Sequence, residues 1–221
     1  SNKSMINIFN SISKKGVIDL DKKTEKSDEL VGRKEELEKL ESSVEELKNS
    51  NGTTHFILGS TGIGKTRLAV EIKNMANYKN IDFIRGRCSI EEYRPYKPFK
   101  EALNKFIKCG RKIDEKRNMV VDSKEKNIDV ENKEMFDALK KSTFFETTQY
   151  VKKLSSKRPL VIFLDDLQWA DKGSLNLLDY MTERLQDEPV LFICTYRPGD
   201  VPSKHPLKET IRRMSRKRTF N

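Results

Sequence analysis

One glycine-rich run decides the fold of this chain: Gly59-Ser60-Thr61-Gly62-Ile63-Gly64-Lys65-Thr66. The run fits the pattern G-x-x-x-x-G-K-[ST] at every fixed position. Glycines let the backbone adopt positive φ and bring main-chain N–H groups close to an anion. The positive end of a helix that follows points at the same anion. The run therefore predicts a phosphate-binding loop, and we expect all eight residues and the adjoining Arg67 to contact a nucleotide.

The sequence on both sides of the loop has the context that this motif requires. A short apolar strand, 55–58, precedes it, and an amphipathic helix carried by Leu68, Ala69, Ile72 and Met75 follows. We expect Lys65 to be a solvent-facing charge that reaches the β- and γ-phosphates, and the Thr66 hydroxyl to ligate Mg²⁺. This context makes a chance glycine-rich turn a poor explanation.

The rest of the chain alternates between helical and strand-like patterns. Continuous apolar runs at 160–164 and 190–195 are typical of parallel strands buried on both faces, and 81–88 predicts a further strand. Helical spacing of apolar residues predicts helices over 35–48, 99–107 and 175–185, and a long helix or a broken pair over 135–154. Strands that alternate with helices indicate an α/β protein with a parallel sheet.

Two carboxylates follow the apolar run at 160–164. Ligands bind beyond the carboxyl ends of the strands in a parallel sheet, so Asp165 and Asp166 are placed to act there. We expect Asp165 to hold Mg²⁺ through water, and Asp166 to position the water that attacks the γ-phosphate. A strand that ends in solvated aspartates is the ordinary alternative, and the phosphate loop makes it the weaker one.

Composition narrows the remaining classes of function. The net charge is +10, and residues 204–218 hold seven basic side chains against Glu209 alone. A solvated helix explains this stretch better than a nucleic-acid contact does. Three widely spaced cysteines and two histidines predict neither a disulfide framework nor a metal centre. Residues 111–131, of which twelve are charged, predict a mobile surface insertion.

No run of apolar residues is long enough to cross a membrane, and no signal segment follows Ser1, so we expect a cytoplasmic protein without a membrane partner. Residues 1–27 lack helical periodicity, and their short apolar groups predict an arm or a strand-like clip onto a neighbouring domain. The expected organisation is an N-terminal arm over 1–27 and a nucleotide-binding domain over 28–221.

Several segments resemble one family in both sequence and order. The run Leu164-Asp165-Asp166-Leu167-Gln168-Trp169-Ala170-Asp171 resembles the Walker B segment of the AAA-like ATPases of the STAND class, which are signal-transduction ATPases with numerous domains. Residues 31–37 are similar to the segment that packs beside the adenine in that family, which implies that Val31, Gly32 and Arg33 contact the nucleotide. Residues 195–200 resemble the sensor segment, which implies that Arg197 lies near the γ-phosphate. The resemblance covers roughly residues 29–213.

The resemblance implies an AAA+/STAND-type P-loop NTPase, a three-layer sandwich whose parallel sheet has the order 5-1-4-3-2. The expected cofactors are ATP or ADP and Mg²⁺, and the expected catalytic residues are Lys65, Arg197 and Asp166. The fifth strand is expected near or beyond Asn221, where a lid or effector domain would follow, and a nucleotide-driven oligomer is a further expected partner.

One departure bears on rate: Asp166 stands where many AAA+ motors have a longer glutamate. The sequence therefore predicts an ATP-binding switch domain that hydrolyses ATP slowly. Two alternatives stay open at this point: a DNA-linked AAA+ ATPase of the origin-recognition type, and a nucleotide-binding interaction module without turnover. DNA as a partner has no further support from the residues of this chain.

Overall fold

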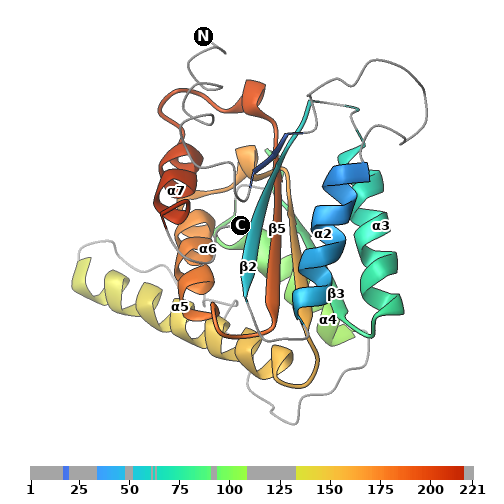
Figure 1. Ribbon diagram of the computed structural model, residues 1–221. Helices are drawn as coiled ribbons and strands as arrows, with labels where there is room; N and C mark the ends of the chain where they lie inside the picture. The colour runs from blue at the N-terminus through green and yellow to red at the C-terminus, as the bar shows by residue number, and fades with distance from the viewer. Residues whose placement is uncertain are drawn as a thin grey trace.

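The computed structural model describes residues 17–19, 34–47, 52–60, 62, 64–90, 94–108 and 133–216. Parallel strands form a single sheet in these residues (Figure 1), and their bounds are β1 (Val17–Asp19), β2 (Thr53–Leu58), β3 (Asp82–Arg87), β4 (Leu160–Asp165) and β5 (Val190–Tyr196). The predicted insertion 111–131, most of the predicted arm, and the predicted nucleotide contacts Val31, Gly32, Arg33, Thr61 and Ile63 lie outside the described residues.

The order of the strands is β1-β2-β5-β4-β3. Counted from the phosphate-loop strand, the four strands β2, β5, β4 and β3 have the expected order 1-4-3-2, and the parallel α/β fold is confirmed. The edge position beside β2 differs from the expectation. It is filled by β1, where Val17 pairs with Phe56 and Asp19 with Leu58, and not by a strand near Asn221. A strand at this position supplies partners for main-chain groups of β2 that would otherwise form an open edge.

Helices cover both faces of the sheet (Figure 1). One face carries α2 (Lys34–Glu46) and α3 (Lys65–Tyr78). The other face carries α4 (Lys97–Lys108), α5 (Lys133–Ser155), α6 (Lys172–Arg184) and α7 (Pro206–Met214). The segment predicted as a long helix or a broken pair is one continuous helix, α5. The result is the three-layer sandwich that the sequence predicts.

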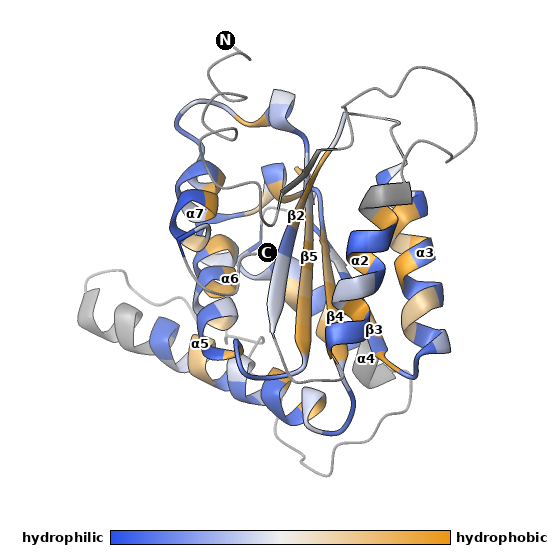
Figure 2. Ribbon diagram, viewed as in Figure 1, coloured by the Kyte–Doolittle hydropathy of each residue, from blue (hydrophilic) through white to orange (hydrophobic). Residues whose placement is uncertain are grey.

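Each face of the sheet packs into its own apolar core, and Figure 2 shows β4 and β5 as largely hydrophobic strands between helices that also carry hydrophobic stretches. All residues of β2, β4 and β5 are buried. Phe163 and Ile193 face α2 and α3, whereas Leu164 and Cys194 face the opposite layer. Because side chains alternate along a strand, Asp165 and Thr195 lie on the α3 side, the side on which the phosphate loop enters its helix.

Candidate nucleotide site

The loop between β2 and α3 has the backbone that its glycines predict. Gly62 has φ 81° and Gly64 has φ 96°, both in the left-handed region that residues with a Cβ rarely adopt. The helix that follows, α3, has no side-chain cap at Gly64 and no acidic residue in its first turn. No carboxylate at these positions therefore competes for the first N–H groups of α3 or for its positive dipole end. An anion-binding helix terminus needs these groups to be available.

Lys65 differs from the expectation of a solvent-facing charge. Its side chain is buried, with 8% of the residue exposed. The ammonium group donates hydrogen bonds to the carbonyl oxygens of Gly59 and of Ser60, the latter at 2.6 Å. A buried ammonium needs such acceptors because burial removes its water. Thr66 and Arg67, the next residues of α3, are exposed.

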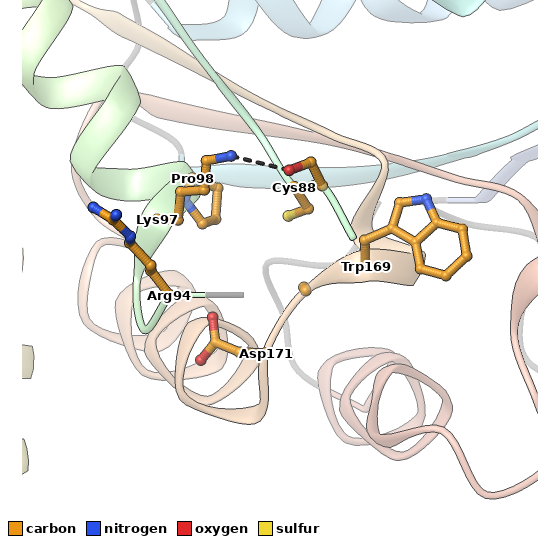
Figure 3. Close-up of a pocket in the computed structure, with 8 residues that line it drawn as sticks. Cys88, Arg94, Lys97, Pro98, Trp169 and Asp171 are labelled. Carbon is orange, nitrogen blue, oxygen red and sulfur yellow. Dashed lines mark hydrogen bonds between the residues drawn. The ribbon is translucent and has the colours of Figure 1, made fainter. Parts of the chain in front are cut away.

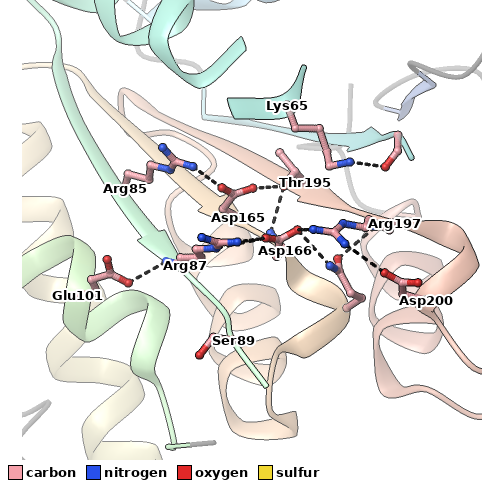
Figure 4. Close-up of polar contacts among 12 residues, drawn as sticks. Lys65, Arg85, Arg87, Ser89, Glu101, Asp165, Asp166, Thr195, Arg197 and Asp200 are labelled. Carbon is pink, nitrogen blue, oxygen red and sulfur yellow. Dashed lines mark hydrogen bonds and ion pairs between the residues drawn. The ribbon is translucent and has the colours of Figure 1, made fainter. Parts of the chain in front are cut away.

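Asp165 ends β4 and is held on both sides (Figure 4). It is 4% exposed, and its Oδ1 accepts a hydrogen bond of 2.6 Å from the Thr195 hydroxyl on the adjacent strand β5. Its Oδ2 forms an ion pair with Arg85 on the other neighbour, β3. The Arg85 guanidinium also lies over the ring of Phe163, 5.7 Å from the centroid. These contacts fix the Asp165 carboxylate at the carboxyl end of the sheet.

Asp166 turns the chain out of β4 with φ 59° and ψ 47°, a left-handed conformation that is uncommon outside glycine. Its Oδ2 accepts from Arg87 Nε at 3.2 Å. Its Oδ1 accepts from Gln168 Nε2 at 3.0 Å and lies 3.4 Å from Arg197 Nη2. Two guanidinium groups and one amide thus surround this buried carboxylate.

Thr195 connects the two aspartates. While its hydroxyl donates to Asp165, the same oxygen accepts a hydrogen bond of 3.1 Å from the main-chain N–H of Asp166. Thr195 is fully buried. One hydroxyl on β5 therefore sets both the carboxylate of Asp165 and the start of the turn at Asp166.

Sequence reasoning did not assign the residues that hold these carboxylates, namely Arg85, Arg87, Gln168 and Thr195. A signal for two of them is present, since Arg85 and Arg87 stand two apart at the carboxyl end of β3 and so share one face of the strand. Thr195 reaches Asp165 from about 30 residues away in the sequence, and Gln168 contacts Arg197 over a similar separation in addition to the nearby Asp166. The sequence offers no rule that pairs them.

A pocket adjoins the site on the side away from the phosphate loop (Figure 3). It is lined by Cys88, Ser89, Arg94, Lys97, Pro98, Trp169, Ala170 and Asp171. Lys97 donates to the Ser89 hydroxyl at 3.1 Å. Asp171 serves as the N-cap of α6 by accepting from the Ser174 N–H at 2.9 Å, so its carboxylate has a structural role. Burial, followed by the negative charges of nearby aspartates, raises the pKa of the Cys88 thiol.

The described residues contain no group of three or more histidine, cysteine or acidic side chains arranged to hold a metal ion by themselves. The donors that the site does offer are the Asp165 carboxylate and the exposed Thr66 hydroxyl. Oxygen donors of this kind, few in number, suit Mg²⁺, which keeps several waters and shares its remaining positions with phosphate oxygens. The residues present therefore fit a magnesium–nucleotide complex.

The fold and the site together define a P-loop nucleotide-binding domain: a parallel sheet, a glycine loop that opens a helix, and a buried aspartate at the end of β4, two strands away from the loop strand β2. Residues 29–193 match the family model described as "AAA ATPase domain", and the chain belongs to this family. It is accordingly an ATP-binding module of the AAA+ type.

No curated protein matches the chain significantly. Among solved structures, a chain of the Drosophila ORC bound to GC-rich DNA and Cdc6 is similar at 9% sequence identity with a TM-score of 0.38. That match covers 86% of this chain and 59% of the other chain. In the part of the chain that the structure describes, no helix is both long and apolar enough to cross a bilayer.

Proposed function

We propose that this domain binds Mg²⁺-ATP and hydrolyses it slowly, as the switch of a regulatory ATPase of the STAND class. The observation that carries the proposal is the placement of two charges at one edge of the sheet. The phosphate loop with Lys65 follows β2, and Asp165 ends β4, with only β5 between these parallel strands. Ligands of parallel α/β sheets bind at this edge.

Each group of the loop has a definite task in this proposal. The main-chain N–H groups of the loop and the first turn of α3 hold the β- and γ-phosphates, and Lys65 exchanges its carbonyl partners for phosphate oxygens. Thr66 and Asp165 hold Mg²⁺, which would offset the charge that develops on the phosphates. Arg67 and the loop residues outside the described part complete the expected cradle, and residues 31–33 are expected beside the base.

Hydrolysis requires a water molecule to attack the γ-phosphorus while the bond to the β–γ bridging oxygen breaks, which yields ADP and phosphate. Asp166 is the carboxylate that orients this water, and Arg197 is the cation that offsets charge on the γ-phosphate. Both residues are engaged with one another at 3.4 Å, and Arg197 also lies 3.5 Å from Asp200. The Asp166 carboxylate already has contacts from Arg87, Gln168 and Arg197, which leave few of its about four acceptor positions for water and support a slow rate.

The described part of the basic stretch does not favour DNA as the ligand. Arg213 on α7 pairs with Asp179 at 3.1 Å and with Glu209 at 3.3 Å, so part of the positive charge is neutralised within the fold. In the intact protein we propose a lid or effector domain as the partner that reads the nucleotide state, a nucleotide-driven oligomer, and a cytoplasmic location. A non-hydrolysing nucleotide-binding module remains the alternative that turnover measurements decide.

The test combines calorimetric titration of Mg²⁺-ATP with a steady-state phosphate-release assay. Asp165→Asn should weaken Mg²⁺-dependent binding. Asp166→Asn should lower turnover by about tenfold or more and change ATP affinity by less than about threefold, because the residue acts on water. Asp187→Asn, at an exposed position after α6, is the matched control and should change neither quantity. Lys65→Ala should abolish tight binding, and retained wild-type affinity would refute the phosphate site.

A further inference from the structure

We infer that Gln168 is a positioning residue that fixes Asp166 and Arg197 relative to one another at the γ-phosphate end of the site. This inference rests on the proposed function, because it concerns the two residues to which the hydrolytic step is assigned. Gln168 lies in the short 3-10 helix η3 (Leu167–Trp169), directly after the turn at Asp166. It contacts both residues through one side-chain amide.

The two ends of that amide have different partners. The Nε2 group donates to Asp166 Oδ1 at 3.0 Å, and Oε1 accepts from the main-chain N–H of Arg197 at 3.1 Å. A carboxylate only accepts and a main-chain N–H only donates, so the chemistry of the partners assigns the amide orientation without ambiguity. Gln168 itself is 2% exposed. Water therefore has little access to compete for either hydrogen bond.

The other groups that touch the Asp166 carboxylate are less constrained. The side chains of Arg87 and Arg197 are 61% and 27% exposed, and both are long cations whose pairing is screened by solvent. Gln168 is neutral and buried, and it belongs to η3, whose Leu167 is part of the apolar core. Of these three contacts, the amide of Gln168 is the one that can hold the carboxylate in a fixed direction.

The same amide sets the position of Arg197. Residues 165–168 and 195–197 belong to different strand ends, and the contact between Gln168 and the Arg197 N–H joins them where β5 ends. The amide therefore links the carboxylate that orients water to the segment that carries the γ-phosphate cation. A displacement of about 1 Å in such a group can lower the reaction rate by about a hundredfold. The side-chain hydrogen bonds of Gln168 join it to Asp166 and Arg197, and none joins it to the described residues of the phosphate loop. Its loss should therefore affect turnover more than nucleotide affinity.

The experiment uses two substitutions of similar length. Gln168→Glu keeps an oxygen that can accept from the Arg197 main-chain N–H. It removes the N–H group that donates to the Asp166 carboxylate, and it places a second carboxylate next to that one. Gln168→Met removes both hydrogen bonds without adding charge. We expect both to reduce kcat by about tenfold or more, with KM within about threefold of the wild-type value. The control is Gln149→Glu, the same chemical change at an exposed position on α5, which should leave both constants unchanged.

A second readout does not depend on turnover. Trp169 is the only tryptophan of the chain and stands next to Gln168 in η3. Loss of the amide contacts should loosen η3, and acrylamide quenching of Trp169 fluorescence should rise by about half or more in both variants but not in Gln149→Glu. If the wild-type chain binds ATP without turnover, the proposed function fails while the quenching still decides whether Gln168 holds η3. Folded variants with wild-type kcat, or with unchanged quenching, would overturn the inference.

Discussion

Replacing Thr195 by valine tests how the two aspartates are held. Valine has nearly the shape of threonine, so the substitution removes the hydroxyl from a fully buried position without opening a large cavity. Two hydrogen bonds disappear: the one donated to Asp165 at 2.6 Å and the one accepted from the Asp166 N–H at 3.1 Å.

The magnitude follows from these two contacts. A hydrogen bond to a charged group contributes about 1.5–3 kcal/mol, and a buried N–H left without an acceptor costs about 1–3 kcal/mol. Because Asp165 keeps its ion pair with Arg85, the lower end of the first range applies. We therefore expect Thr195→Val to lower the free energy of unfolding by about 3 kcal/mol. It should also weaken Mg²⁺-dependent ATP binding, since the Asp165 carboxylate loses a contact that orients it.

The chain provides a close control on the same sheet. Thr54 on β2 is 1% exposed, and its hydroxyl has no hydrogen-bond partner in the described part of the chain. Thr54→Val should therefore be neutral or stabilising, because it removes an unsatisfied polar group. Urea unfolding followed by circular dichroism measures both variants. If Thr195→Val and Thr54→Val change the unfolding free energy equally, the hydroxyl bridge has no energetic importance and the reasoning fails.

Two further predictions concern packing and thiol chemistry. A Cβ at Gly86 would lie 1.7 Å from a main-chain oxygen at the start of α4. Gly86→Ala should therefore destabilise the fold by about 3 kcal/mol or more, which a shift of the urea midpoint would measure. An unshifted midpoint would contradict the close approach of β3 and α4. Burial raises the pKa of both Cys88 and Cys194, which keeps them as protonated thiols at pH 8, below the raised pKa. In a Cys109→Ser background neither should react rapidly with a disulfide reagent until the chain is unfolded, and rapid labelling of the native protein would show that these thiols are accessible.

The sequence predicted those parts of the structure that depend on local pattern. The loop glycines, the apolar runs of β4 and β5 and the helical spacing after Lys65 each have one physical interpretation, and the structure agrees with it. The order of the four central strands came from the family resemblance and is confirmed. The burial of Lys65 was not predicted, because the sequence does not show that the loop carbonyls fold back onto its ammonium group.

The contacts around Asp166 depend on pairing between distant segments, which a single sequence does not specify. Arg87 reaches the carboxylate because β3 and β4 are neighbours in register, and Gln168 reaches the Arg197 N–H because η3 lies at the end of β5. Each of these side chains, taken alone in the sequence, has an ordinary interpretation as a surface cation or a polar loop residue. The roles assigned to Asp165, Asp166 and Arg197 remain predictions for the experiments described above.

The short strand β1 has a practical consequence for anyone who shortens this chain. Among the described residues, the three of β1 pair with the outer side of β2 along Phe56–Leu58. A variant that begins after Asp19 would leave the main-chain groups of β2 along this stretch unpaired, as an exposed strand edge beside the nucleotide loop. A second molecule could add a strand there, and the protein would then associate. Any other segment that pairs with the outer edge of β2 must first displace residues 17–19. Truncation and fusion experiments on this domain should therefore start ahead of Val17.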